Sequence, residues 1–194
     1  MSAAQNIIHD FRMPTVFRVG VGAFTTLVKE IEELGAKKVA IVSDKGLEKV
    51  GVVQKVLDHI MPLSVPTITY TEISGEPTFQ LLKDAVQTLD AEKCDLIIGI
   101  GGGSALDVAK ATAALCGKGD ITKYINGEKV VESRTVKSIL LPTTSGTGSE
   151  VTPFAIITDA DTGVKWPIAD YALLPNMAIV DVDNMMTQPK GLTS

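Results

Sequence analysis

The sequence has few cysteines and no long apolar run. Its two cysteines, Cys94 and Cys116, lie in apolar segments and form no CxxC pair, which argues against a disulfide framework and favours a reducing compartment. No run approaches the ~18 consecutive apolar residues of a membrane span. Residues 1–13 are polar and mixed, without the apolar core of a signal peptide. We therefore expect a cytoplasmic protein without a membrane partner.

Histidine is scarce, and positive charge is scattered. The chain has two histidines, His9 and His59, and neither belongs to a metal-ligand spacing. Its 18 Lys and Arg residues, against 23 Asp and Glu, form no basic stripe, so we expect no nucleic-acid partner. The net charge of -5 still allows an anionic ligand, because backbone amides and helix termini bind anions locally.

Strand-like apolar runs alternate with amphipathic segments of helical length. Continuous apolar strands separated by helices predict a doubly wound α/β domain, with a mainly parallel sheet covered on both faces. At 194 residues the whole chain, 1–194, is consistent with one domain. Strands are expected at 39–44, 67–70, 95–100, 138–142 and 178–181, and helices at 24–34, 52–60, 78–89 and 104–115.

Two regions depart from this alternation. Residues 15–20 alternate between apolar and polar types and predict a half-exposed or edge strand. Later, the short apolar runs 154–158 and 164–168 flank the Asp- and Gly-rich segment 159–163. That pattern predicts a β-hairpin.

A glycine-rich loop at 99–107 joins a predicted strand to a predicted helix. Glycines allow close backbone approach to a pyrophosphate, and the helix N-terminus attracts the anion. We expect Ser104 to cap the helix, with Asp107 completing a box-like arrangement. The loop follows the third strand rather than the first, so it is not the usual Rossmann fingerprint. The alternative is a tight turn that binds nothing.

A second loop, at 142–150, follows the next predicted strand and is dense in hydroxyls and glycines. Open α/β sheets bind ligands at the carboxyl ends of their strands. Alone, this segment is as consistent with an ordinary surface loop. Together with the loop at 99–107, it predicts two loops that flank one crevice.

Asp44 ends the first strand of the alternation. A carboxylate there can accept hydrogen bonds from an adenosine ribose and repel a 2′-phosphate, which favours NAD over NADP. It can equally be the N-cap of the next helix. The segment 76–78 can be only a turn and a cap.

These residues resemble the group III, iron-dependent alcohol dehydrogenases. The similarity rests on GGGS at 101–104 with Asp107 and Lys110, and on TTSGTGSEVT at 143–152. Residues 42–45 and 76–78 match the family's adenosine-side motifs. The resemblance covers essentially the whole chain. The stretch 151–181 looks most like the alcohol dehydrogenase part of bifunctional aldehyde–alcohol dehydrogenases.

The resemblance implies a role for particular residues. Asp44 contacts the adenosine ribose, and the glycine loop holds the pyrophosphate. The threonines line the adenine and phosphate side, and Lys165 reaches the nicotinamide ribose. Phe154 lies near the nicotinamide, where substrate enters, and the early edge strand pairs with its copy in a homodimer or higher homo-oligomer. The implied cofactor-binding set is Asp44, Gly101, Gly102, Gly103, Ser104, Asp107, Thr143, Thr144, Thr147 and Lys165.

Full-length members of the family carry a C-terminal helical domain that supplies an Asp and three His ligands to one metal ion. This chain ends at Ser194, before the first of those ligands is expected. The resemblance therefore implies that it binds NAD but not the Fe²⁺ or Zn²⁺ of the full-length enzyme, and contributes no catalytic residue. We expect it to be inactive alone, and the face normally covered by the missing domain to be apolar.

The resemblance implies interconversion of alcohols with aldehydes or ketones by hydride transfer. One alternative is a catalytically inactive nucleotide-binding or dimerisation module, which the missing ligands motivate. Another is a relative with altered chemistry, like the glycerol dehydrogenases and dehydroquinate synthases. The stretch at 143–150 favours the alcohol dehydrogenases over the latter.

Overall fold

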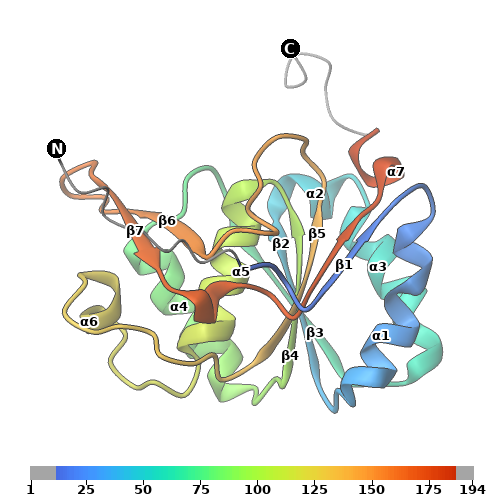
Figure 1. Cartoon of the computed structure of the whole chain (residues 1–194), viewed down its shortest axis with the longest axis horizontal. Coiled ribbons are helices and arrows are strands. Elements are labelled where there is room, and N and C mark those ends of the chain that lie inside the picture. Colours follow the sequence, from blue (N-terminus) through green and yellow to red (C-terminus); the bar gives the residue numbers. More distant parts are fainter. Residues whose placement is uncertain (1–11, 187–194) are drawn as a thin grey trace, which may run out of the picture.

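A computed structural model describes residues 12–186 as an α/β fold with one large sheet (Figure 1). The six-stranded sheet has the order β1-β8-β5-β4-β2-β3, and every pairing in it is parallel. Strands β6 and β7 form a separate antiparallel pair. The strands are β1 (Val16–Val19), β2 (Val39–Asp44), β3 (Thr67–Ile73), β4 (Leu96–Gly101), β5 (Lys137–Pro142), β6 (Phe154–Thr158), β7 (Lys165–Ala169) and β8 (Met177–Val180).

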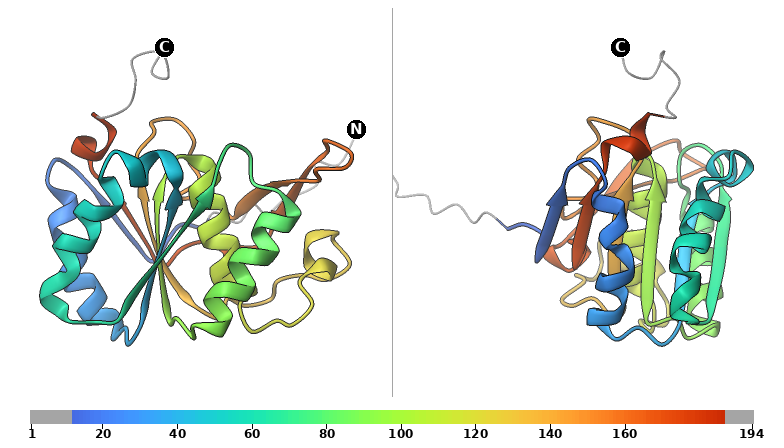
Figure 2. Two further views of the ribbon diagram at one scale, coloured as in Figure 1. Left: turned by 180° about the vertical axis from the view of Figure 1, so that it is seen from behind. Right: turned by 90° about the vertical axis from the view of Figure 1, so that its right-hand side faces the viewer.

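Helices cover both faces of the large sheet, as predicted. Helices α1 and α3 pack on one face, whereas α4 and α5 pack on the other (Figures 1 and 2). The α-helices are α1 (Leu27–Leu34), α2 (Lys45–Lys49), α3 (Val52–Ile60), α4 (Phe79–Ala91), α5 (Gly103–Leu115), α6 (Thr122–Ile125) and α7 (Val182–Met185). Short 3₁₀ helices are η1 (Ala23–Thr26), η2 (Met61–Leu63) and η3 (Tyr171–Leu173). Within residues 12–186, no helix combines the length and apolarity needed to cross a bilayer.

Strand β4 lies near the middle of the sheet and is buried along its whole length. Its residues alternate between the two apolar cores, so that Ile97 faces α4 and α5 while Ile98 faces α1 and α3. At Gly99 the strand contacts α5 directly, because an added Cβ would lie 2.6 Å from the Cβ of Ala109. This close packing brings the first turn of α5 to the carboxyl edge of the sheet.

The hairpin lies on the α4 and α5 side of the sheet (Figure 1). Strands β6 and β7 pair from Phe154 opposite Ala169 to Thr158 opposite Lys165, which confirms the predicted hairpin. Ala155 and Ile157 are buried in the same core as α5, whereas Phe154 and Ile156 on the other face are exposed. One face of the hairpin is therefore packed against the core, whereas the opposite face is exposed.

Candidate functional site

Two loops meet at the carboxyl edge of the sheet, after β4 and after β5. The backbone N–H of Thr143 donates to the carbonyl of Gly101 (2.9 Å). A Cβ on Gly102 would lie 2.8 Å from Oγ1 of Thr144, and one on Gly103 would lie 3.5 Å from Thr147. The two loops therefore lie side by side. That they flank one crevice stays a prediction, because the residues that line the two cavities described below include none from 142–150.

The first turn of α5 has no side-chain cap. Its N-cap is Gly102, in an extended conformation, and no side chain bonds to the free amides. The expectation that Ser104 caps the helix was wrong, because the helix begins at Gly103 and places Ser104 inside the first turn. Gly101, with φ of 151°, makes the turn into the loop and lies where a Cβ would meet Ala105 at 2.6 Å. The uncapped amides and the helix dipole favour an anion here.

A cavity of about 320 Å³ opens beside this helix terminus. It lies between α5 and the ends of β2 and β3. Its lining residues are Asp44, Lys45, Gly46, Ile73, Ser74, Gly75, Gly102, Gly103, Ser104 and Ala105.

Asp44 lies in this cavity and is also the N-cap of α2. Its side chain accepts a hydrogen bond from the backbone N–H of Leu47 (2.9 Å), which confirms the capping interpretation. One carboxylate oxygen makes that bond, so capping is compatible with a ligand contact through the other. The ribose contact stays a prediction.

A second cavity of about 270 Å³ adjoins the first, because Gly103 and Ser104 line both. It lies between the first turns of α5 and the hairpin. The other residues that line it are Glu76, Pro77, Asp107, Ile156, Thr158 and Lys165.

An ion pair lies at the rim of the second cavity. Lys165 Nζ is 2.5 Å from Oε1 of Glu76, and Thr158 Oγ1 donates to the other oxygen at 3.3 Å. The hydrogen bond from Lys165 lowers the pKa of Glu76. The sequence left two readings of 76–78 open, a turn with a cap or, from the family resemblance, an adenosine-side motif. The cap is confirmed at Thr78, which accepts from the N–H of Leu81, but no pattern predicted the ion pair across 89 residues.

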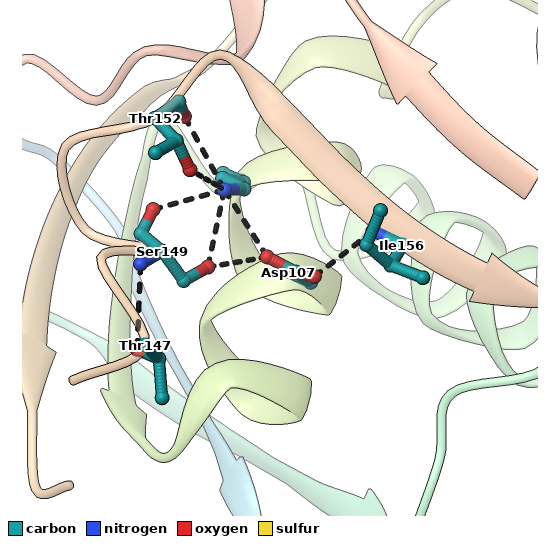
Figure 3. A network of polar contacts seen from close by, with 6 residues as sticks. Asp107, Thr147, Ser149, Thr152 and Ile156 are labelled. Carbon is teal, nitrogen blue, oxygen red and sulfur yellow. Dashed lines mark hydrogen bonds and ion pairs between the residues drawn. The ribbon is translucent and has the colours of Figure 1, made fainter. Parts of the chain in front are cut away.

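Asp107 makes internal contacts instead of a capping box. Its carboxylate accepts from the hydroxyl of Ser149 and from the backbone N–H of Ile156 (2.9 Å), and forms an ion pair with Lys110 (Figure 3). Burial lowers the pKa of Lys110, and the neighbouring Asp107 opposes that shift. The resemblance placed Asp107 among the cofactor-binding residues. The structure places it at the edge of the second cavity, 8% exposed.

Phe154 lies outside both cavities. Its side chain is 48% exposed and lines a separate hollow with Pro153, Ala169, Asp170 and Tyr171. On β6 it shares the outward face with Ile156, which lines the second cavity. A substrate-proximal role for Phe154 stays a prediction.

No group of three or more His, Cys, Asp or Glu side chains in residues 12–186 is arranged to hold a metal ion. His59 packs against Phe24, with 4.5 Å between the ring centroids. His9 lies outside the described residues.

The site can be compared with known proteins through sequence and fold. The chain is 33% identical to the NAD-dependent methanol dehydrogenase of Bacillus methanolicus over 184 residues, covering 95% of this chain and 48% of that one. It is 36% identical over 201 residues to the bifunctional aldehyde-alcohol dehydrogenase of Escherichia coli (strain K12), covering 97% and 22%. Aldehyde-alcohol dehydrogenases are thus among its relatives, as the resemblance implied.

Solved structures show the same architecture. The crystal structure of sulfoacetaldehyde reductase from Bifidobacterium kashiwanohense in complex with NAD+ superposes with a TM-score of 0.88 at 30% identity, covering 97% of this chain and 50% of that one. The chain spans half the length or less of the curated relatives named above and corresponds to the N-terminal portion of the iron-containing alcohol dehydrogenase family. The family profile "Iron-containing alcohol dehydrogenase" matches residues 14–182, and the chain belongs to that family.

Proposed function

We propose that this chain is the NAD(H)-binding portion of a metal-dependent alcohol dehydrogenase. The observation that carries the proposal is the uncapped N-terminus of α5, which lies where the glycine-rich loop at 99–107 meets the threonine-containing loop at 142–150 and opens onto two adjoining cavities. Such a terminus is suited to a pyrophosphate, and cavities on either side of it suit the two nucleoside halves of a dinucleotide.

In this proposal the chain's own residues bind and orient the cofactor. Residues 101–104 hold the pyrophosphate, because the uncapped amides at the N-terminus of α5 attract an anion. Thr143, Thr144 and Thr147 line the adenine and phosphate side, and Asp44 accepts hydrogen bonds from the adenosine ribose in the first cavity. Lys165 contacts the nicotinamide ribose in the second. Phe154 lies farther along the hairpin, toward the substrate.

When bound, the nicotinamide would supply the hydride acceptor, and a divalent metal such as Fe²⁺ or Zn²⁺ would supply Lewis-acid chemistry toward the alcohol oxygen. We assign the metal ligands to the part of the relatives that extends beyond this chain. The substrates are then alcohols and aldehydes, by analogy with the relatives' names. The buried free thiols of Cys94 and Cys116 support a cytoplasmic setting.

Calorimetric titration of the chain with NADH, NAD and NADP, without metal, tests the proposal. We expect NADH and NAD to bind and NADP to bind at least about tenfold more weakly, because the charge of Asp44 repels a 2′-phosphate. Asp44→Ser retains a capping hydroxyl but removes the charge, and is expected to narrow the difference between NAD and NADP.

Asp120→Ser is the matched control, because Asp120 accepts from the N–H of Thr122 near α6, away from both cavities. It is expected to leave the preference unchanged. The proposal would be contradicted if the unmodified chain bound none of the three nucleotides. An unchanged preference in Asp44→Ser would remove the role of Asp44 alone.

A further inference from the structure

Lys110 lies in the middle of α5 with its side chain fully shielded from solvent. Its ammonium lies near the carbonyl and hydroxyl oxygens of Ser149 (2.9 and 3.1 Å) and of Thr152 (3.3 Å each). Oδ1 of Asp107 is 3.1 Å away. Three N–H bonds thus meet five acceptor oxygens. An apolar side chain could fill this space without removing a charge from water, so the arrangement points to positional specificity rather than to stability.

Asp107, one helical turn earlier, makes a different pair of contacts. One carboxylate oxygen accepts the hydroxyl hydrogen of Ser149, and the other accepts the backbone N–H of Ile156. In Figure 3 Asp107 lies between Ser149 and Ile156, which come from opposite sides of the helix. Together, Asp107 and Lys110 contact three points along 149–156: Ser149 in the second loop, Thr152 after it, and Ile156 in β6.

Ser149 and Ile156 connect to the two segments on either side of the proposed cofactor site, the loop at 142–150 and the β6–β7 hairpin. Ser149 belongs to the loop at 142–150, the threonine-rich loop, and its N–H donates to Oγ1 of Thr147. Ile156 pairs with Pro167 on β7, the strand that begins at Lys165. The helix that carries Asp107 and Lys110 supplies the N-terminus between these two segments.

We infer that Asp107 and Lys110 are positioning residues: Lys110 fixes the threonine-rich loop, and Asp107 fixes the hairpin that carries Lys165. This inference rests on the proposed function and gives Asp107 a positioning role in place of direct cofactor contact. Neither side chain needs to touch the dinucleotide, because each acts through the backbone segment that it holds.

Two substitutions separate the two roles. Lys110→Met removes the contacts to Ser149 and Thr152 but leaves Asp107 bonded to Ser149 and Ile156. In Asp107→Asn the carbonyl oxygen stays toward the Lys110 cation and Ser149, so the amide NH₂ faces the N–H of Ile156. Two donors then oppose each other, and the link to the hairpin is lost. Thr112→Val is the control, because Thr112 is fully buried on the same helix and its hydroxyl has no hydrogen-bond partner.

The readout is affinity for ADP and for NADH, measured by calorimetry where circular dichroism shows each variant folded. ADP lacks the nicotinamide half and does not need the hairpin. Asp107→Asn is expected to weaken NADH by about tenfold and ADP by less than about twofold, whereas Lys110→Met weakens both by about tenfold. Thr112→Val is expected to change neither. An equal loss of both ligands in Asp107→Asn would overturn the inference, because general loosening of the fold gives that result.

Hydrogen exchange of the chain without any nucleotide gives an independent readout. Asp107→Asn is expected to accelerate exchange of the Ile156 amide, and Thr112→Val to leave it unchanged. An unchanged Ile156 amide in Asp107→Asn would also overturn the inference. If the unmodified chain binds neither ADP nor NADH, the proposed function fails, and the exchange pattern alone then decides whether the pair fixes the loop and the hairpin.

Discussion

Two glycines near the end of β4 are required for different physical reasons. Gly99 is a packing residue, because an added Cβ would lie 2.6 Å from Ala109 and 2.7 Å from Leu140. Gly101 is a conformational residue, with a positive φ of 151° that other side chains rarely adopt. The position of α5, and with it the proposed anion site, depends on both.

Gly99→Ala is expected to destabilise the chain by roughly 1–3 kcal/mol, because the new methyl overpacks the contact between β4 and α5. Denaturant unfolding measures the change. Gly103→Ala is the matched control for stability, since its Cβ would meet Thr147 at an ordinary 3.5 Å. Equal unfolding free energies for Gly99→Ala and Gly103→Ala would contradict the packing role of Gly99.

At the scale of single residues, the sequence predicted the two loops better than it predicted the contacts between side chains far apart in the chain. The two glycine-containing loops were predicted from composition and from their place after strands, and the structure brings them together. The bonds of Asp107 to Ser149 and of Lys165 to Glu76 join residues 42 and 89 positions apart. No local pattern encodes such pairs, because they form only when segments far apart in the sequence come together in the fold. The N-cap of α5 is Gly102, two residues before the predicted Ser104.

Among the elements, those with a clear apolar period were predicted well. The predicted strand at 39–44 and helix at 52–60 coincide with β2 and α3. Helices α2, α6 and α7 have five, four and four residues, which is too short to display a helical period. They depend on caps and packing instead, as at Asp44 and Asp181.

Asp181 joins three elements at one carboxylate. It is the N-cap of α7, directly after β8, and accepts from the N–H groups of Asp183 (3.0 Å), Gly22 (3.2 Å) and Phe24 (2.9 Å). Burial alone would raise the pKa of Asp181, but these three backbone donors outweigh it and hold the pKa below its ordinary 3.8. The carboxylate therefore fastens the turn after β1 to the end of β8.

Because this pKa is lower in the folded state than in the unfolded chain, the charged form stabilises the fold above pH 3.8. That stability is lost as the pH falls through 3.8 toward the folded-state pKa. Asp181→Asn is expected to lower the free energy of unfolding near neutrality by roughly 1–3 kcal/mol and to weaken its acid dependence.

Unfolding curves at about pH 7 and between about pH 5 and pH 3 measure both effects. Asp170→Asn is the control, because Asp170 accepts a single cap bond, from Ala172. If Asp181→Asn retained the acid dependence of the unmodified chain, the role given to this carboxylate would be refuted.

At the scale of the whole molecule, β1 leaves one side of the large sheet open. In the part of the chain that the structure describes, β1 pairs only with β8, and Phe17 and Val19 are 43% and 61% exposed. The expected edge strand is therefore confirmed. An apolar edge with free backbone groups invites pairing with another chain, and we propose that two copies pair through β1.

If two copies pair through β1, Val19→Lys is expected to convert the proposed dimer to a monomer, because a lysine on an edge strand opposes strand pairing. Sedimentation velocity measures the change. Val50→Lys is the matched control, since Val50 is 68% exposed at the end of α2, away from β1. A Val19→Lys chain that sediments like the unmodified one would rule out this interface.

The sheet order also constrains when the fold can form. The first strand in the chain pairs with the last strand of the sheet, Val16 opposite Met177, and β5 contacts β8 through two residue pairs only. Contacts of such long sequence separation require a large loop to close first, which slows folding. During synthesis β2, β3, β4 and β5 can assemble before β8 is available to pair with β1. The β1 edge of the sheet is therefore the last part to be completed. Until residue 180 has left the ribosome, β1 remains an unpaired apolar strand in the nascent chain.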